Sequence, residues 1–487
     1  MAAASTIVRP GAWAARRPAA AQEARLRLLI ASGGDDRIWL DPTTRRNRYG
    51  VPAEPAPDEL WFSSSTACAV SPRGWAAAGE ALERLTEPGC HTIAAFFEAL
   101  RLRLLALYGA PGAEAVLAAS GTEAELVTLS LALSLAQGPV VNIVVAPAET
   151  GSGVPAAASG QHFLGRASLG GPVAKASRLT GWEDAQVTLE TIEIRGPGGA
   201  LRAQADVDQE AALKVERAVA GGAFALLHVL DASKTGRPGV SRAAASKILA
   251  RYPERVLVVV DACQLRCAAA DVRADLERGL AVMVTGSKFA GGPAFCGALL
   301  LPAVLAERLA QAAQVNAGPP NAALAPYSAA LDWPARLRRR FAAGLAHPAN
   351  LGLGLRWSAA LAEIEAYEAV PAEWRAAMLA DFDRAVRARV AADPGLTLAD
   401  DGAGSAPGLV PIFHTGGADP RAVYEALTSG EGARRPCHLG QPVAVGAALA
   451  LRVCASMPMI AGAAEHGFAA IESDLDEAFE SWARLRG

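Results

Sequence analysis

Short, mostly apolar runs alternate in the middle of the chain with Ala- and Leu-rich stretches of helical character, and this alternation restricts the fold more than any other feature. The apolar runs include residues 140–145, 223–229 and 256–260. Strands that are apolar on both faces must be covered by helices on both faces, which is typical of a mostly parallel sheet in an α/β protein. Ligands of such sheets bind beyond the carboxyl ends of the strands. The sequence therefore predicts an α/β fold with a site at that edge of the sheet.

The length of the chain predicts more than one structural unit. With 487 residues, of which 52 % are apolar, the chain exceeds a usual single domain and can bury a large core. We expect an N-terminal arm and lead-in over residues 1–60, a large α/β domain over 61–335, and a smaller α+β C-terminal domain over 336–487.

The expected C-terminal domain has its own pattern of elements. A helix is expected over residues 351–367, and strands are expected near 409–413 and 449–454. Pro411 would confine the first of these strands to the edge of a sheet, because proline lacks the N–H group that a central strand needs.

Two of the predicted strand ends carry a carboxylate and a lysine. Asp261 directly follows the run 256–260, and Lys288 follows Thr285 and Ser287 at the end of the next strand. An aspartate after a strand usually caps the loop that follows. The pair together is what bound pyridoxal phosphate requires, since the carboxylate keeps the pyridine nitrogen protonated and the lysine forms the Schiff base.

A turn of small residues upstream offers a place for an anion. Ser120, Gly121 and Thr122 lead into the apolar helical stretch 126–135. Free N–H groups at the start of a helix, together with a hydroxyl group, suit a phosphate. An ordinary N-cap followed by acidic first-turn residues is the alternative. The order of phosphate turn, Asp261 and Lys288, each at a strand end, favours a cofactor site.

On these motifs the chain resembles the fold-type I pyridoxal phosphate enzymes, in particular the class V aminotransferase and cysteine desulfurase branch, from about Phe62 to the C-terminus. The resemblance implies pyridoxal 5'-phosphate (PLP) as the cofactor. It assigns the phosphate to Gly121, Thr122, Thr285 and Ser287, the ring nitrogen to Asp261, the phenolic oxygen to Gln264 with Ser233 over it, and the Schiff base to Lys288. Arg452, within an apolar strand, takes the place of the arginine that binds the substrate carboxylate.

Two positions depart from the pattern of this branch. Thr150 stands where relatives stack an aromatic or histidine side chain on the pyridine ring. Either another residue, with His162 as a candidate, covers the ring, or the site is open for a bulkier reactant. Leu439 stands at the place of the desulfurase nucleophile, with Cys437 two positions before it. A lone cysteine is more often a small buried hydrophobe, so sulfur transfer is disfavoured.

These departures favour an enzyme that acts on an α-amino acid by lyase or carbon-carbon bond-forming chemistry of the decarboxylative aldol type. Arg452 would bind the carboxylate, and Lys288 would serve as general acid and base. A class V aminotransferase is the first alternative. A cysteine desulfurase or lyase, and a non-catalytic binding protein of the same fold, are the others.

Composition excludes some classes of partner. The net charge is −3, and the one basic cluster, residues 336–340, has a helical pattern, so nucleic acid is not an expected partner. Seven cysteines without metal-ligand spacing predict reduced thiols, a cytoplasmic location and no metal site. No apolar stretch reaches the roughly 18 residues of a membrane span. By resemblance, the loop 316–321 reaches a neighbouring subunit, which implies a homodimer, and a plain surface loop is the alternative. The first twenty residues are rich in Ala and Arg and carry no acid, and we expect them to form a mobile arm.

Overall fold

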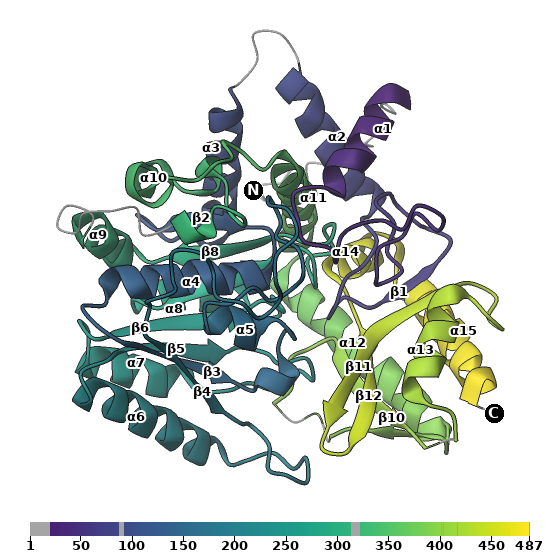
Figure 1. The fold of residues 1–487 in the computed structure, drawn as a ribbon. Helices are drawn as coiled ribbons and strands as arrows, with labels where there is room; N and C mark the ends of the chain where they lie inside the picture. Colours follow the sequence, from purple (N-terminus) through teal and green to yellow (C-terminus); the bar gives the residue numbers. More distant parts are fainter. Residues whose placement is uncertain are drawn as a thin grey trace, which may run out of the picture.

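Two β-sheets, each with its own set of helices, build the molecule (Figure 1). The computed structural model describes residues 20–86, 92–312, 322–400, 402, 404–415 and 417–486. The loop 316–321 and residues 1–19 of the expected arm lie outside these residues. Residues 20–60 of the expected lead-in are described and contribute both a helix and the start of a strand.

The larger sheet has seven strands in the order β2-β8-β7-β6-β5-β3-β4. Their bounds are β2 (Glu114–Ala118), β3 (Val140–Val145), β4 (Val187–Ile192), β5 (Phe224–Leu230), β6 (Val256–Ala262), β7 (Ala281–Thr285) and β8 (Gly297–Leu301). Neighbours from β4 to β7 pair in parallel, whereas β8 is antiparallel to both β7 and β2. The predicted mostly parallel sheet is confirmed.

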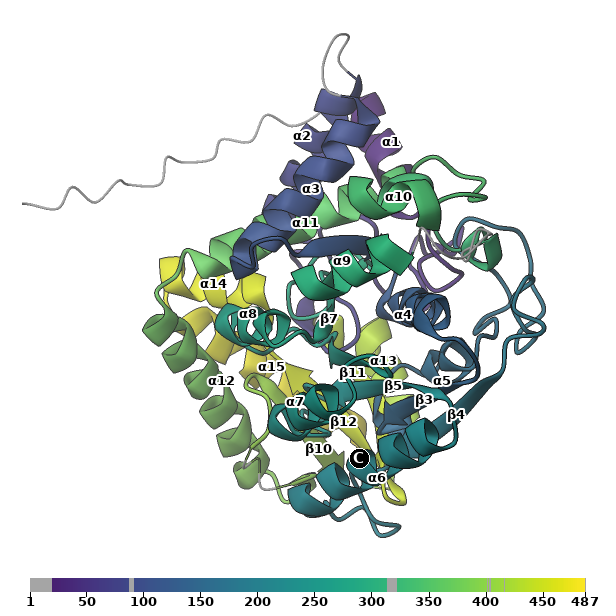
Figure 2. The same ribbon diagram turned by 90° about the vertical axis from the view of Figure 1, so that its left-hand side faces the viewer.

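Helices cover both faces of this sheet (Figure 2). One face carries α4 (Gly121–Leu135) with α9 (Ala303–Ala312) beside it, and the other carries α3 (Ile93–Tyr108), α6 (Gln204–Ala220), α7 (Arg242–Arg251) and α8 (Ala269–Glu277). Alternate residues of β6 enter the two layers, because Val258 and Val260 belong to one apolar cluster and Leu257 and Val259 to the other. Because both faces of the sheet are covered by helices, its central strands are apolar at nearly every residue.

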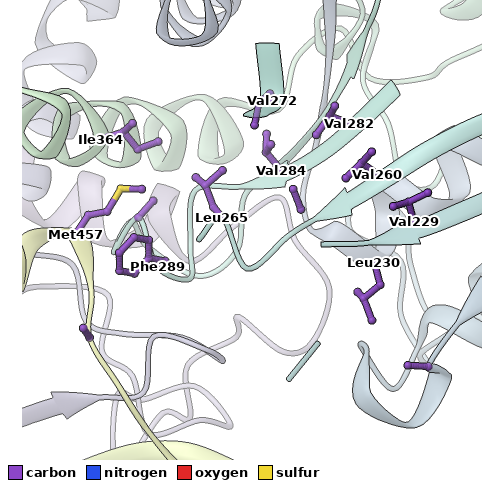
Figure 3. Packing of buried hydrophobic residues seen from close by; sticks show 14 of the residues in the cluster. Val229, Leu230, Val260, Leu265, Val272, Val282, Val284, Phe289, Ile364 and Met457 are labelled. Carbon is purple, nitrogen blue, oxygen red and sulfur yellow. The ribbon is translucent and has the colours of Figure 1, made fainter. Parts of the chain in front are cut away.

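The packing under the carboxyl ends of the central strands is close. Figure 3 shows Val229, Val260 and Val284 of neighbouring strands in one layer with Leu265 and Val272. Leu265 lies in the turn after β6, and Val272 lies in α8. The strand ends that border the site therefore rest on a buried apolar layer, which fixes their position.

The smaller sheet has five strands in the order β1-β11-β12-β10-β9. Their bounds are β1 (Leu60–Phe62), β9 (Leu396–Leu398), β10 (Leu409–His414), β11 (Cys437–Val445) and β12 (Ala448–Cys454), and the helices around them are α12 (Ala372–Ala392), α13 (Pro420–Ser429), α14 (Met457–His466) and α15 (Ala469–Arg486). The expected strands near 409–413 and 449–454 and the α+β character of the C-terminal part are confirmed. The first strand, however, comes from the N-terminal lead-in, and β1 pairs in parallel with β11.

The prediction that Pro411 marks an edge strand is wrong. Strand β10 pairs with β12 on one side and with β9 on the other. The carbonyl of Pro411 accepts a hydrogen bond from the N–H of Ala399, just past the end of β9. The missing N–H of Pro411 thus faces the β9 side, so the ladder between β10 and β12 loses no hydrogen bond.

The lead-in and the C-terminal part meet at a group of long helices. Helices α1 (Ala20–Ile30) and α2 (Pro72–Thr86) pack on α11 (Leu351–Glu368), which confirms the helix expected over 351–367. Arg356 of α11 is fully buried and donates to the carbonyls of Ile30, Ser32, Gly33 and Phe295. It thereby ties residues 30–33 to the body of the molecule.

The remaining short elements are α5 (Val154–Ala158), α10 (Ala335–Phe341) and the 3-10 helices Pro147–Glu149, Ala322–Leu324 and Ala330–Asp332. Helix α10 confirms the expected helix over the arginine cluster. Among the helices of the described residues, none has the length and hydropathy of a membrane span.

Candidate active site

The carboxyl ends of β3, β5, β6 and β7 and the start of α4 border one cavity. Eight of the ten residues that the sequence assigns to a site line it, namely Gly121, Thr122, Thr150, Asp261, Gln264, Thr285, Ser287 and Lys288. Ser233 and Arg452 do not line it. Within the described part of the chain, no group of three or more His, Cys, Asp or Glu residues is arranged to hold a metal ion.

Asp261 combines an ordinary capping role with a place at the cavity. It lies one residue before the end of β6, opposite Leu230 of β5 and Met283 of β7. Its Oδ1 accepts a hydrogen bond of 3.0 Å from the N–H of Cys263, which caps the following loop. Its Oδ2 has no hydrogen-bond partner among the described residues, so this oxygen is available to a ligand.

A buried polar group lies beside Asp261 on the neighbouring strands. His228 of β5 lines the cavity, and its Nε2 lies 3.2 Å from Glu125 Oε1 and 2.9 Å from Asn142 Oδ1. Burial lowers the pKa of His228, but the charge and hydrogen bond of Glu125, with the charge of Asp261, outweigh burial and raise it. Sequence reasoning missed this group, although Asn142 and His228 are conspicuous as polar residues inside apolar runs.

The start of α4 presents backbone N–H groups to the cavity. Ser120 is the N-cap and accepts a hydrogen bond from Glu123, whereas the N–H groups of Gly121 and Thr122 have no acceptor among the described residues. A Cβ at Gly121 would lie 2.8 Å from the Sγ of Cys263, so only glycine fits there. The N-cap interpretation of the turn is confirmed, and the free N–H groups are compatible with the predicted anion site.

The surroundings of this turn favour an anion. Arg37 of the lead-in lines the cavity, is held by Asp35 at 2.6 Å, and donates to Ser120 Oγ at 3.0 Å. Burial and the charge of Asp35 raise the pKa of Glu123 to about 8, so this neighbouring carboxyl is largely neutral at pH 7. No local pattern around Arg37 predicts its contact with a turn more than eighty residues away.

The residues before the lysine are buried and only partly satisfied. Thr285 ends β7 and donates its hydroxyl to the carbonyl of Cys263 at 2.6 Å. The hydroxyl of Ser287 and the amine of half-buried Lys288 form no hydrogen bond or ion pair with the described residues. The side chain of Gln264 donates to the carbonyl of Ser65, but its Oε1 is buried without a partner.

Ser233 lies in the predicted loop, but its side chain points elsewhere. Its hydroxyl donates to Glu149 Oε2 at 2.8 Å and accepts the N–H groups of Thr235 and Arg237. The structure therefore does not bring Ser233 to the cavity, because its hydrogen bonds fix the loop itself. The next residue, Lys234, lines the cavity instead.

Arg452 lies directly behind the cavity wall. Its guanidinium donates to the carbonyl of Gln441 at 2.7 Å and to Thr66 Oγ1 at 3.2 Å, and both of these residues line the cavity. It is 1 % exposed, and it has no carboxylate within ion-pair distance among the described residues. Burial lowers its pKa. A buried arginine that meets only neutral acceptors lacks a counter-ion.

His162 does not cover a ligand in this cavity. Its Nδ1 lies 2.7 Å from the hydroxyl of Tyr327, and its ring does not line the cavity, so that suggestion is wrong. Thr150 does line the cavity and donates to the carbonyl of Pro147. Phe295, in edge contact with Tyr49, brings the aromatic surface that sequence reasoning did not find.

Cys437 is remote from this chemistry. It lies in β11 opposite Leu60 and is fully buried, and burial raises the pKa of its thiol to about 12. Neither Cys437 nor Leu439 lines the cavity. A thiol that stays protonated at neutral pH is a poor nucleophile.

Three solved structures are similar to the chain over most of its length. A phosphoserine aminotransferase from Cytophaga hutchinsonii is 12 % identical, with a TM-score of 0.55, over 87 % of this chain and 99 % of its own. A cysteine desulfurase from Escherichia coli is 16 % identical, with a TM-score of 0.54, over 88 % and 94 %. A C-DES variant with glycine covalently linked to its PLP cofactor is 13 % identical, with a TM-score of 0.54, over 86 % and 96 %. The chain has the fold of these proteins.

The resemblance to the class V aminotransferase and cysteine desulfurase branch is thus confirmed in the fold. No protein-family model and no curated protein matches the sequence.

Proposed function

We propose that the protein is a PLP-dependent enzyme that acts on an α-amino acid, with Lys288 as the covalent anchor of the cofactor. The observation that carries this proposal is the convergence of Lys288, Asp261 and the bare N-terminus of α4 on one cavity. A C-DES variant of the same fold holds glycine linked to PLP, and a phosphoserine aminotransferase shares the fold.

The unsatisfied groups of the cavity fit the parts of this cofactor. The N–H groups of Gly121 and Thr122 and the hydroxyl of Ser287 have no acceptor among the residues that the structure describes, and they would hold the phosphate. Oδ2 of Asp261 would face the ring nitrogen, and the free end of the Gln264 amide would serve the phenolic oxygen. When bound, PLP supplies an electron sink for a bond broken at the α-carbon.

The residues of the chain then have distinct tasks. Asp261 holds the proton of the ring nitrogen, and Lys288 moves a proton at the α-carbon of the substrate. Arg452 has no counter-ion in the described part of the chain and lies behind Thr66 and Gln441, so the substrate carboxylate would reach it at that wall. The thiol of Cys437 is remote and protonated, which argues against sulfur transfer by this residue.

For the reaction class we propose lyase or carbon-carbon bond-forming chemistry. The support is Thr150, which lines the cavity. At this position the class V branch has an aromatic or histidine side chain, and the smaller threonine leaves room for a second reactant. Transamination is the competing proposal, since a phosphoserine aminotransferase and a ureidoglycine-glyoxylate aminotransferase share the fold. If the protein is a transaminase, an amino donor supplied without an acceptor would convert its bound cofactor to the amine form, with one equivalent of keto product per site.

A homodimer and a cytoplasmic location remain predictions of the sequence. The six cysteines of the described residues are unpaired. Sedimentation of the purified protein would measure the oligomeric state.

The visible spectrum of the protein with PLP tests the assignment. We expect an absorbance band of lysine-bound cofactor that survives gel filtration and is lost in Lys288→Ala. Lys247→Ala, which changes an exposed lysine of α7, is the matched control and should keep the band. A band that persists in Lys288→Ala, or a wild type that retains no PLP, would overturn the proposal. A coloured protein that releases no product from any amino acid, with or without an aldehyde or keto acid, would indicate the non-catalytic alternative.

A further inference from the structure

A second lysine lies at the cavity wall. Lys234 follows β5, and its backbone N–H donates to the carbonyl of Glu149 at 2.8 Å, which fixes the loop. Its side-chain ammonium has no hydrogen bond or ion pair among the described residues. Burial and the positive charges of Arg452 and Lys288 lower the pKa of Lys234 to about 8, so the amine is still largely protonated at pH 7.

The carboxylate whose charge acts on Lys234 is already engaged. Glu149 accepts a bond of 2.5 Å from Arg195 Nε and one of 2.8 Å from Ser233, and it also binds Thr235. Its charge raises the pKa of Lys234, but burial and the two positive charges outweigh this effect. The ammonium of Lys234 therefore stays without a counter-ion in a half-buried site, which is unfavourable unless a ligand supplies one.

The other charges around the cavity are balanced in pairs. The pairs are Arg37 with Asp35, His228 with Glu125, and Arg195 with Glu149. On the proposed function, Asp261 is neutralised by the ring nitrogen, and the amine of Lys288 loses its charge as the anchor. Two cations remain, Lys234 and Arg452.

These two cations are neighbours. Nη1 of Arg452 lies 3.5 Å from the backbone oxygen of Lys234, and the charge of Arg452 acts on the ammonium. Thr66 and Gln441, which Arg452 binds, line the same cavity as Lys234. The contact with Arg452 places Lys234 with the end of the cavity at Thr66 and Gln441, which is the proposed substrate end, rather than with the start of α4.

We propose that Lys234 determines substrate specificity and that, with Arg452, it selects an amino acid with two carboxylates. Arg452 takes the α-carboxylate, and the Lys234 ammonium takes the side-chain carboxylate. This assignment rests on the proposed function. Two uncompensated cations require two anionic groups, and a neutral amino acid would leave one of them unpaired.

The test is a spectral titration of the PLP-loaded enzyme with L-aspartate and L-glutamate against L-asparagine and L-glutamine. We expect the acidic amino acid to bind about tenfold tighter or more than its amide, which corresponds to at least about 1.4 kcal/mol. Lys234→Met should remove that preference while weakening amide binding less than about threefold, and Lys234→Arg should retain part of it. Lys247→Met is the matched control and should match the wild type.

Succinate and butyrate give a second readout that needs no amino group. Succinate should raise the Tm of the loaded enzyme more than butyrate does, and Lys234→Met should abolish the difference. The proposal is overturned if the wild type binds aspartate no better than asparagine, or if Lys234→Met weakens both equally. Loss of bound PLP in Lys234→Met would instead assign the lysine to the cofactor phosphate. Failure of the proposed function would be distinct, because the wild type would then lack the cofactor band altogether.

Discussion

Gly121→Ala should damage the phosphate end of the cavity through a single contact. The new Cβ would lie 2.8 Å from the Sγ of Cys263 and 3.4 Å from the Cγ2 of Thr285. The first distance is far inside van der Waals contact, and Cys263 is held between β6 and the Thr285 hydroxyl, so the start of α4 must move. Overpacking of this kind costs about 1–3 kcal/mol of unfolding free energy, which lowers Tm by a few degrees in a protein of this size.

The same displacement should weaken PLP binding. A hydrogen bond to a charged group contributes about 1.5–3 kcal/mol, so misplacing one N–H from the phosphate raises the Kd about ten- to a hundredfold. Kd would be measured by titrating apoenzyme with PLP and following its visible band. The matched control is Gly138→Ala, an exposed position where a Cβ meets nothing within 4 Å.

A second substitution identifies the cause. Cys263→Ala removes the sulfur that the new methyl group meets, so the Kd of Gly121→Ala/Cys263→Ala should return toward that of Cys263→Ala alone. The coupling between the two sites is read from this double-mutant cycle. The reasoning is refuted if Gly121→Ala matches Gly138→Ala in Tm and Kd, or if the two substitutions are additive.

Three further outcomes are expected. Asp261→Asn should retain PLP but lower kcat by roughly a hundredfold, because the amide cannot stabilise the protonated ring nitrogen; unchanged kcat in a product assay would remove Asp261 from the mechanism. Cys437→Ala should lower the free energy of unfolding by about 1–2 kcal/mol through the cavity it leaves, with full activity per folded molecule, and denaturant unfolding beside an activity assay checks both. The preference for acidic amino acids should be strongest at pH 7 and below and should fade as the pH rises, because the Lys234 ammonium, whose pKa is lowered by burial and by the charge of Arg452, then loses its proton. In Lys234→Arg the preference should persist at pH 9, and a wild-type preference that survives at pH 10 would contradict this.

Much of the larger sheet and its strand ends could be predicted from local sequence. Apolar runs fix the strands, and the strands fix where Asp261, Thr285 and Lys288 must lie, because the carboxyl ends of parallel strands meet at one edge. The N-terminus of α4 follows from Ser120 and the apolar stretch behind it.

The remainder depends on contacts that no local pattern records. Whether Ser233 or Lys234 faces the cavity is decided by the hydrogen bonds of Glu149, which ends the 3-10 helix after β3. Arg37 reaches the phosphate turn only because the lead-in packs over it. Pro411 can lie inside a sheet because its missing N–H faces the β9 side. The strand propensity of proline does not predict which side that is.

The parallel pairing of β1 with β11 has a consequence for the order in which the molecule can assemble. Leu60 pairs with Cys437, so the lead-in leaves the ribosome long before its partner strand has been made. Contacts between residues that lie so far apart in the sequence form slowly, and domains fold from the N-terminus during synthesis. The smaller sheet therefore closes last, and until then the edge of β11 is open to other chains. A shortened protein that begins after Phe62 would keep this edge open permanently and should aggregate, even though every cavity residue after Phe62 is still present.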